Sequence, residues 1–415
     1  MSFRGYIDLL RDSGLMKEIY DPVSPVLEAA ALARNLGPIF FHSIDNKRCC
    51  MNILGSRDLL ARAMGIAKEK MIGYLGKIDY GSGQIKEVDS SSLEEIVSEP
   101  DLGKLPILTH FPGDGGPYIT SGVVISKLGD EVNASVHRMM VLSKDTLAAR
   151  LVPNRHTHML YHEAKRRGLN LPVAIAIGID PLMLIAASTR VPPKMEFLYA
   201  SALMRGPIDL FYLENGVPVP EAEIVLEGYI SSEQALEGPF VDITGTRDLV
   251  RPEPVIRLTR MMTREDPIYH GLIPSGGEHK MLMGIPYEPL IFREVSKVVK
   301  VRDVVLTEGG CCYLHAVIQI EKDDESDAKR AIDAAMEAHR SLKHIVVVDA
   351  DIDIHKSEDI EYAVATRVKG DEDIHIYPKV RGSTLDPRSI DGITTKVGVD
   401  ATAPLKNLAK FERVQ

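Results

Sequence analysis

The pattern of apolar and polar positions differs between three stretches of the chain. Up to about residue 100, helical and strand-like periods are mixed. Helices are expected over residues 3–13, 25–35 and 56–65, and short strands over 39–43 and 48–53. Ser91 is positioned to cap a further helix. The Pro- and Gly-rich stretch from Phe111 to Pro117 then predicts a boundary.

Between residues 118 and 300, β-branched residues dominate. Strands are expected over 119–128, 133–141, 172–179, 208–214 and 222–230, and helices over 158–167 and 181–187. Because strands outnumber helices and most turns contain Gly or Pro, we expect a barrel or a curved sheet rather than a doubly wound domain.

The last third alternates strand and helix. The expected order is strand 313–321, helix 326–342, strand 344–354, helix 357–368 and strand 374–380. This β-α-β-α-β order predicts a compact α/β lobe with its own core.

Composition excludes several classes of protein. The 415 residues carry 49 Lys and Arg against 59 Asp and Glu, and this net charge of −10 argues against general nucleic-acid binding. No apolar run approaches the length of a membrane span, and the chain opens on an amphipathic segment, so neither a span nor a signal peptide is expected. The cysteines form two adjacent pairs, which bridge poorly and lack zinc-site spacing. A reducing cytoplasm is therefore the expected location.

A histidine cluster is the first candidate for chemistry, since no Walker A string, GxGxxG or GxSxG motif occurs in the sequence. His158 and His162 are four residues apart on an expected helix and are able to share a metal, with His156 just ahead. Solvated imidazoles at the start of a basic helix explain the cluster equally well.

Acidic residues form the second candidate, at Asp349, Asp351 and Asp353, followed by His355. Alternation places them on one face of a strand end, as in a divalent-metal phosphatase. A strand whose other face is buried while its acids meet water gives the same pattern. We favour this structural interpretation because the intervening residues are apolar.

The third candidate is the pair Glu237 and Asp242, five residues apart across a Gly-Pro turn. Two such carboxylates converge on one pocket in many acid–base sites, with one ionised and the other protonated. Most Glu-Gly-Pro sequences are merely turns, so the pattern alone identifies no site.

Five segments, in order, resemble the UbiD family of decarboxylases, which use prenylated FMN. They are residues 133–138 (NASVHR), 171–181 (LPVAIAIGIDP), 222–228 (AEIVLEG), 237–242 (EGPFVD) and 396–402 (KVGVDAT). The resemblance runs from about residue 105 to the C-terminus.

The resemblance implies catalytic roles for three residues. Loss of CO2 leaves an electron pair that no side chain absorbs, and prenylated FMN is the family's electron sink. Arg138 matches the arginine that faces the substrate, and its guanidinium suits a carboxylate. Glu237 matches the carboxylate that orients this arginine. Asp242 matches the acid that protonates carbon after CO2 leaves, which requires it to carry a proton at working pH.

The resemblance also implies a cofactor-binding set. Asn133, His156 and Glu196 match the ligands of a divalent ion, and the mixed oxygen and nitrogen donors suit Mn²⁺ better than zinc; His158 is an alternative to His156. Residues 187–188 fall where some relatives hold a monovalent cation such as K⁺. The other positions at which relatives contact the cofactor are Val136, His137, Arg138, Arg150 and Lys396.

The implied architecture is α+β and has three parts. These are an N-terminal α/β domain (1–112), a central split β-barrel that binds the flavin (113–300) and a C-terminal α/β lobe with an oligomerisation segment (301–415). Homodimers or dimer-built hexamers are expected, and a separate flavin prenyltransferase is expected to supply the cofactor.

The expected substrate is a small unsaturated carboxylic acid. The chain resembles the compact archaeal branch that converts trans-anhydromevalonate 5-phosphate to isopentenyl phosphate, in isoprenoid precursor synthesis by the mevalonate pathway. The polar residues His137, His279 and Lys280 suit a phosphate better than an aromatic ring, although surface solvation explains them too. An aromatic acid such as 4-hydroxy-3-polyprenylbenzoate is the alternative substrate. A non-catalytic flavin or metal binder is a further alternative, against which the intact Arg138, Glu237 and Asp242 argue.

Overall fold

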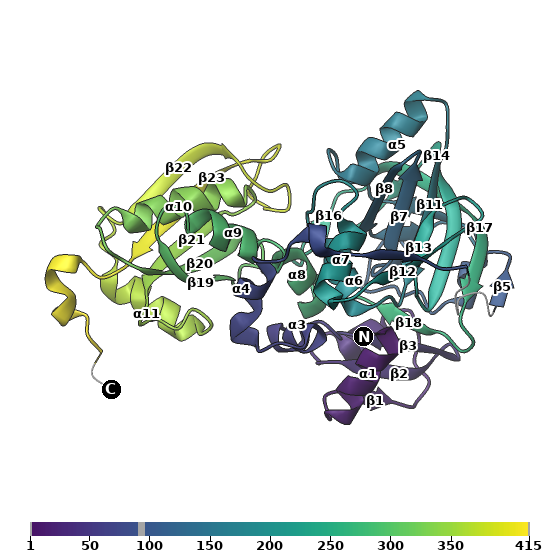
Figure 1. Ribbon diagram of the computed structural model, residues 1–415, viewed down its shortest axis with the longest axis horizontal. Coiled ribbons are helices and arrows are strands. Elements are labelled where there is room, and N and C mark those ends of the chain that lie inside the picture. Colours follow the sequence, from purple (N-terminus) through teal and green to yellow (C-terminus); the bar gives the residue numbers. More distant parts are fainter. Residues whose placement is uncertain (1, 90–95, 414–415) are drawn as a thin grey trace. The chain divides into compact units, whose positions relative to one another are not determined.

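The computed structural model describes residues 2–89 and 96–413 and contains two compact units, whose elements are labelled in Figure 1. Unit 1 consists of Met1–Lys68 and Ile78–His279, and unit 2 of Glu69–Lys77 and Lys280–Gln415. The helix expected to start at Ser91 lies outside the described residues. The division into three parts stays a prediction.

Unit 1 opens with helix α1 (Phe3–Asp12), whose N-cap Ser2 accepts a hydrogen bond from the N–H of Gly5. Helices α2 (Glu28–Ala33) and α3 (Arg57–Met64) follow, and α3 is capped by Ser56 at its start and by left-handed Gly65 at its end. A four-stranded sheet has the order β1 (Lys17–Ile19), β2 (Ile39–Ile44), β3 (Lys47–Met51) and β18 (Ile268–Gly271).

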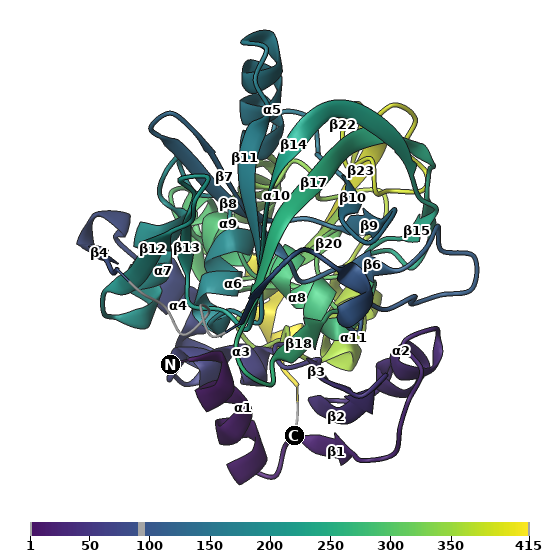
Figure 2. The ribbon, with the colours of Figure 1, turned by 90° about the vertical axis from the view of Figure 1, so that its right-hand side faces the viewer.

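The largest sheet of unit 1 has nine strands. Its pairing path is β6-β9-β10-β17-β14-β11-β7-β8, with β5 beside β17, and the path is open among the described strands. Figure 2 shows β14 and β17 as long, curved neighbours. The nine strands are β5 (Ile96–Ser98), β6 (Tyr118–Ile119), β7 (Val123–Leu128), β8 (Glu131–Val136), β9 (Met139–Val141), β10 (Thr146–Ala149), β11 (Leu171–Ile177), β14 (Ile224–Glu237) and β17 (Arg251–Thr263).

One continuous core joins these two sheets. Phe41 and Met51 of the four-stranded sheet belong to the same buried cluster as Val124, Ile175 and Leu226 of the nine-stranded sheet. Burial of each such side chain contributes about 1.5–3 kcal/mol, so the two sheets stabilise each other. The stretch from Phe111 to Pro117 lies inside this unit.

The remaining elements of unit 1 surround the large sheet. They are helices α5 (His156–Arg166), α6 (Pro181–Ser188) and α7 (Glu196–Met204), the small sheet of β13 (Pro218–Pro220), β12 (Ile208–Tyr212) and β4 (Ile85–Glu87), and the hairpin of β15 (Phe240–Val241) and β16 (Arg247–Asp248). The strand expected over 133–141 is interrupted at His137 and Arg138, which lie between β8 and β9.

Unit 2 is an α/β lobe with its own core, as the last third of the sequence predicts. Its sheet has the order β19 (Lys300–Leu306), β20 (His315–Glu321), β21 (His344–Asp349), β23 (Ile393–Ala401) and β22 (Ile374–Arg381). The expected strand 344–354 is too long, because β21 ends at Asp349 and a turn follows. The helices are α4 (Met71–Leu75), α8 (Gly277–Gly284, which starts in unit 1), α9 (Glu288–Val295), α10 (Asp327–Ala338) and α11 (Ser357–Arg367).

The mixed helix and strand content agrees with the expected α+β class. In the described part of the chain, no helix is long and apolar enough to cross a membrane. The four cysteines are free thiols.

Candidate active site

The segment EGPFVD forms a tight reversal at the end of β14. Glu237 is the last residue of that strand, a cis peptide joins Gly238 to Pro239, and Phe240 opens the β15–β16 hairpin. Gly238 has φ of +102°, a conformation that glycine adopts without strain. The carbonyl of Pro239 accepts a hydrogen bond from Gly115 at 2.8 Å. The Gly-rich stretch expected to mark a boundary therefore packs against this turn.

Arg138 brings three carboxylates together from the break between β8 and β9. Its Nε and Nη2 each lie 3.0 Å from an oxygen of Glu237, in a two-point contact. Its Nη1 donates to Asp242 Oδ2 at 2.8 Å, and Nη2 also donates to Asp248 Oδ2 at 2.8 Å. The predicted trio of Arg138, Glu237 and Asp242 therefore forms one hydrogen-bonded cluster.

Aromatic rings close the inner side of this cluster. The carboxylate of Glu237 is fully buried and accepts a further hydrogen bond from the Tyr118 hydroxyl at 3.1 Å. The ring of Phe240 lies 4.6 Å from the Arg138 guanidinium carbon and 4.7 Å from the Tyr118 ring. Burial opposes the charge of Arg138, but Glu237, together with Asp242 and Asp248, holds the pKa of Arg138 above its ordinary value.

Asp248 is a member of the cluster that the sequence analysis missed. Arg251 grips it through two nitrogens, at 2.8 and 2.5 Å, and the N–H of Leu249 donates to it at 2.8 Å. Burial alone would raise the pKa of Asp248, but Arg251 and Arg138 lower it to about 2. The only sign of this role in the sequence was that Asp248 and Arg251, two residues of opposite charge three positions apart, follow the EGPFVD segment.

Gly115 offers a direct test of how the turn is held. A Cβ at Gly115 would meet the Gly238 carbonyl oxygen at 2.3 Å, whereas a Cβ at Gly116 would have its nearest neighbours at 3.8 Å. We expect Gly115→Ala to lower the free energy of unfolding by about 1–3 kcal/mol and to reduce activity, because backbone must move in the turn. Gly116→Ala is the matched control and should change neither. Denaturant unfolding of both variants measures the difference, and equal stability would refute this packing.

The predicted cofactor residues Asn133 and His137 lie in a second polar cluster on the same strand. The Asn133 amide nitrogen donates to Ser135 Oγ at 3.0 Å and to Thr157 Oγ1 at 2.9 Å, so the amide oxygen points the other way. His137 Nε2 lies 2.9 Å from Ser135 Oγ, and its Nδ1 lies 2.9 Å from the Arg150 carbonyl. Burial lowers the pKa of His137. The neutral imidazole is therefore favoured at His137.

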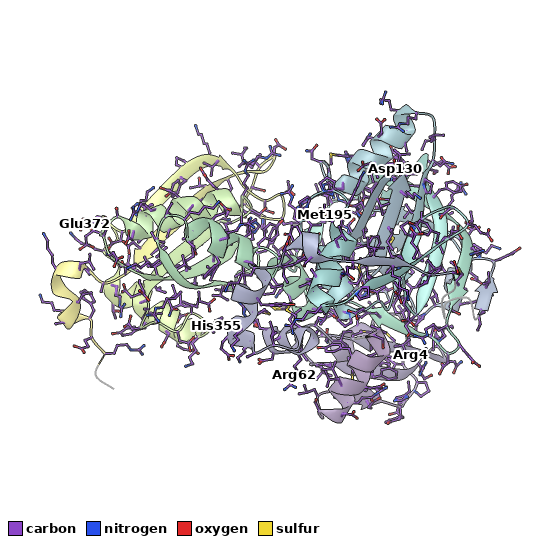
Figure 3. The ribbon with its side chains drawn as sticks, in the orientation of Figure 1. Arg4, Arg62, Asp130, Met195, His355 and Glu372 are labelled. Carbon is purple, nitrogen blue, oxygen red and sulfur yellow. The ribbon has the colours of Figure 1, made fainter. Side chains whose placement is uncertain are left out.

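His156 is the histidine that lies beside Glu196. Its Nδ1 is 3.6 Å from Oε1 of Glu196, the first residue of α7. Met195, the N-cap residue of this helix, is labelled in Figure 3. His158 instead turns to His162, with 3.1 Å between the Nε2 atoms. Burial raises the pKa of Glu196 to about 7, and burial, with nearby arginines, lowers the pKa of His156.

This donor set fits a divalent cation. A buried carboxylate without a strong cationic partner is costly, and a metal ion between Glu196, His156 and the amide oxygen of Asn133 would compensate it. Over the described ranges, 2–89 and 96–413, no group of three or more His, Cys, Asp or Glu side chains is arranged to hold a metal. A metal site here would therefore need a ligand of another kind, such as the amide oxygen of Asn133.

The other predicted cofactor residues lie as follows. Arg150 Nη1 pairs with the buried Glu253 at 2.6 Å. Val136 ends β8, and Ser188 of the expected K⁺ segment donates to Leu184 O at the end of α6. In unit 2, Lys396 is buried and its Nζ donates to the Arg340 carbonyl at 2.7 Å; burial lowers the pKa of Lys396.

The three acidic residues Asp349, Asp351 and Asp353 of unit 2 all form ion pairs. Arg367 bonds both Asp349 and Asp351, with 2.6 Å between its Nη2 and Asp351 Oδ2. Asp353 pairs with Lys356 at 3.0 Å, and His355, labelled in Figure 3, lies 2.9 Å from Asp303. Because these acids are neutralised by basic side chains, the structural interpretation is favoured over a phosphatase site.

Three family models match almost the whole chain. They are described as 3-octaprenyl-4-hydroxybenzoate carboxy-lyase N-terminal domain (residues 7–78), Rift-related domain (85–277) and C-terminal domain (280–401). The anhydromevalonate phosphate decarboxylase of Methanosarcina mazei is 54% identical, over 100% of this chain and 99% of its own length.

The chain is also similar to solved structures of UbiD-class enzymes. The UbiD-class enzyme HmfF from Pelotomaculum thermopropionicum, in complex with FMN, is 36% identical with a TM-score of 0.97, covering 100% of this chain and 97% of its own. An evolved dimeric form of that enzyme, in complex with prFMN, is 35% identical with a TM-score of 0.91, covering 100% and 96%.

Proposed function

The chain belongs to the UbiD family of carboxy-lyases, and on this premise we propose that it decarboxylates trans-anhydromevalonate 5-phosphate to isopentenyl phosphate, in isoprenoid precursor synthesis. The resemblance predicted from the five segments is confirmed, and so is the prediction of a decarboxylase. The observation that carries the proposal is the hydrogen-bonded cluster of Arg138, Glu237 and Asp242.

Arg138 is proposed to hold the substrate carboxylate. Its guanidinium is fixed on one edge by the two-point contact with Glu237 and on one face by Phe240. Nη1 and Nη2 also donate to Asp242 and Asp248 on the outward side, and a carboxylate fits the edge between these two nitrogens by two parallel hydrogen bonds. Glu237 thus orients Arg138 and does not itself contact the substrate.

Asp242 is proposed to return the proton. When the bond to the carboxylate breaks, CO2 leaves and its electron pair stays behind; a proton must then reach the same carbon. Asp242 Oδ1 accepts from the N–H of Ile243 at 2.7 Å, which fixes the carboxyl plane, and Oδ2 faces Arg138. A proton on Oδ2 is therefore released beside the group that held the departing carboxylate.

Prenylated FMN, when bound, supplies the sink for the electron pair that CO2 leaves behind. Asn133, His156 and Glu196 are proposed to hold Mn²⁺, which binds the flavin phosphate, and Arg150 to add positive charge. Residues 187–188 are proposed for K⁺. The proposal includes a split-barrel form of the large sheet, a homodimer or dimer-built hexamer, and a flavin prenyltransferase as the source of the cofactor; the evolved relative of known structure is described as dimeric.

The proposed metal ligands lead to different predictions for the neighbouring residues His156 and His158. His156→Ala is expected to lower bound Mn²⁺ at least about tenfold, because it removes one of three ligands beside the buried Glu196. His158→Ala, the matched control on the same helix, should keep full metal content, because His158 faces His162. Metal analysis of the purified variants measures this. Loss of metal in His158→Ala with retention in His156→Ala would reverse the assignment.

The identity of the substrate rests on separate evidence from the catalytic cluster. His137 is used internally by Ser135 and the Arg150 carbonyl, and His279 Nδ1 accepts from the N–H of Ser275 at 3.0 Å. The phosphorylated substrate is therefore supported by similarity to the relative from Methanosarcina mazei rather than by these histidines.

A side-by-side assay tests the proposed function. The holoenzyme, loaded with prenylated FMN and Mn²⁺, is offered trans-anhydromevalonate 5-phosphate and 4-hydroxybenzoate, and CO2 release is measured. Turnover of the phosphate alone supports the proposal. Turnover of the aromatic acid alone would keep the catalytic cluster and overturn the substrate.

A further inference from the structure

The guanidinium of Arg138 has few N–H groups left for a substrate. Of its five N–H bonds, Nε donates one and Nη2 one to Glu237, Nη1 donates one to Asp242, and Nη2 gives its second to Asp248. A carboxylate that binds the outer edge of Arg138 by two parallel hydrogen bonds needs one N–H from Nη1 and one from Nη2. The N–H on Nη2 is the one that Asp248 holds.

One edge and one face of the Arg138 guanidinium are covered. The side chain of Glu237 is 0% exposed and Tyr118 covers it, and Phe240 covers one face of the guanidinium. The side chains of Asp242 and Asp248 are 17% and 19% exposed, so they mark the outward side. A substrate carboxylate that approaches Arg138 from this side meets these two acids.

Asp248 keeps its place without Arg138. Arg251 grips both of its oxygens at 2.8 and 2.5 Å, and the N–H of Leu249 donates to Oδ1 at 2.8 Å. If Arg138 turns its N–H to another carboxylate, Asp248 remains neutralised by Arg251. A buried carboxylate that lost its only cation would instead oppose the exchange.

We propose that Asp248, held by Arg251, occupies the substrate-carboxylate position on Arg138 Nη2 in the free enzyme and yields it when substrate binds. Asp248 is thus a positioning residue that competes with the substrate for one N–H of Arg138. Arg251 is the counter-ion that neutralises Asp248 after the exchange. The inference rests on the proposed function only in taking the substrate to be a carboxylate. No covalent step is involved.

Two variants with opposite expected effects test this. In Asp248→Asn the competing charge is gone, so a carboxylate should bind about fivefold to tenfold more tightly, in keeping with the loss of one charge-assisted hydrogen bond. In Arg251→Gln, Asp248 keeps Arg138 and the N–H of Leu249 but loses its second cation, so it competes more strongly and binding should weaken by about the same factor. Glu233→Gln is the matched control, because Glu233 makes a similar two-point contact with Arg257 on the exposed side of β14 and β17.

The readout is calorimetric binding of 3-methylcrotonate, an unsaturated carboxylate without phosphate, to the flavin- and metal-loaded protein, together with kcat and KM for trans-anhydromevalonate 5-phosphate. The expected pattern is tighter binding in Asp248→Asn, weaker binding in Arg251→Gln and no change in Glu233→Gln. Unchanged or weaker binding in Asp248→Asn overturns the proposal, as does tighter binding in Arg251→Gln. If Asp248→Asn fails to fold, the Arg251→Gln result decides.

Failure of the proposed function is distinguishable from failure of this inference. A wrong substrate shows as absent turnover of the phosphate by the wild-type enzyme, whereas the role of Asp248 shows only in the ratio of 3-methylcrotonate affinities between variants. A merely structural Asp248 would lower kcat and stability without tightening carboxylate binding.

Discussion

Arg138→Ala is expected to lower kcat/KM for decarboxylation by about 10³-fold, because it removes the charge and the fixed fork that hold the reacting carboxylate. Arg251, the neighbouring arginine, does not replace it, because Asp248 occupies two of its nitrogens. Steady-state CO2 release at matched flavin and metal content measures the loss. Arg257→Ala removes a similar but exposed ion pair with Glu233 and should retain activity. A fall of less than about tenfold in Arg138→Ala would contradict the proposed role.

The same substitution is expected to destabilise the protein. Glu237 is fully buried, and without Arg138 the Tyr118 hydroxyl is the only hydrogen-bond partner left to its carboxylate among the described residues. An uncompensated buried charge of this kind costs about 3–5 kcal/mol. Adding Glu237→Gln to Arg138→Ala should recover part of the loss in Tm, because an amide carries no charge, and should recover no activity. Activity and stability are thereby separated.

Asp242→Asn is expected to lower kcat by about 10²–10⁴-fold, because an amide supplies no proton to the carbon that loses CO2. The shape of the side chain is kept, and the amide oxygen accepts from Ile243 or from Arg138, so one of these two hydrogen bonds is lost and the other remains. Substrate binding should therefore change much less than kcat. Asp242→Glu, which restores the acid, should recover part of the rate. Near-normal turnover by Asp242→Asn would remove Asp242 as the proton donor.

Local signals predicted much of the fold correctly. The cap at Ser56 and the left-handed Gly65 bound α3 where the sequence placed them, and the apolar run from Val173 marks β11. The 13-residue β17 was missed because Pro252 and Pro254 stand in its first half, where it pairs with β14 beyond a bulge. The order of the strands in each sheet is set by pairing between segments far apart in the sequence, and local sequence patterns do not reveal that pairing.

The candidate site was predicted only in part, and the missed members were recruited by tertiary contacts. Glu237 and Asp242 lie in a recognisable segment, but Asp248 enters the cluster because the β15–β16 hairpin folds it back to Arg138. The polar character of His137 was visible in the sequence, whereas its burial against Ser135 was not. Gly115 lies in the stretch expected to mark a boundary, and its close contact with Gly238 was not visible in the sequence.

The most direct test of the central claim counts deuterium in the product. The wild-type holoenzyme is given trans-anhydromevalonate 5-phosphate in D2O, and CO2 and product are quantified by mass spectrometry and NMR. The account predicts one deuterium per CO2, located at the carbon that carried the carboxylate, and loss of both CO2 and labelled product in Arg138→Ala. No CO2 release from this substrate, or the same yield of CO2 and label in Arg138→Ala, would contradict it.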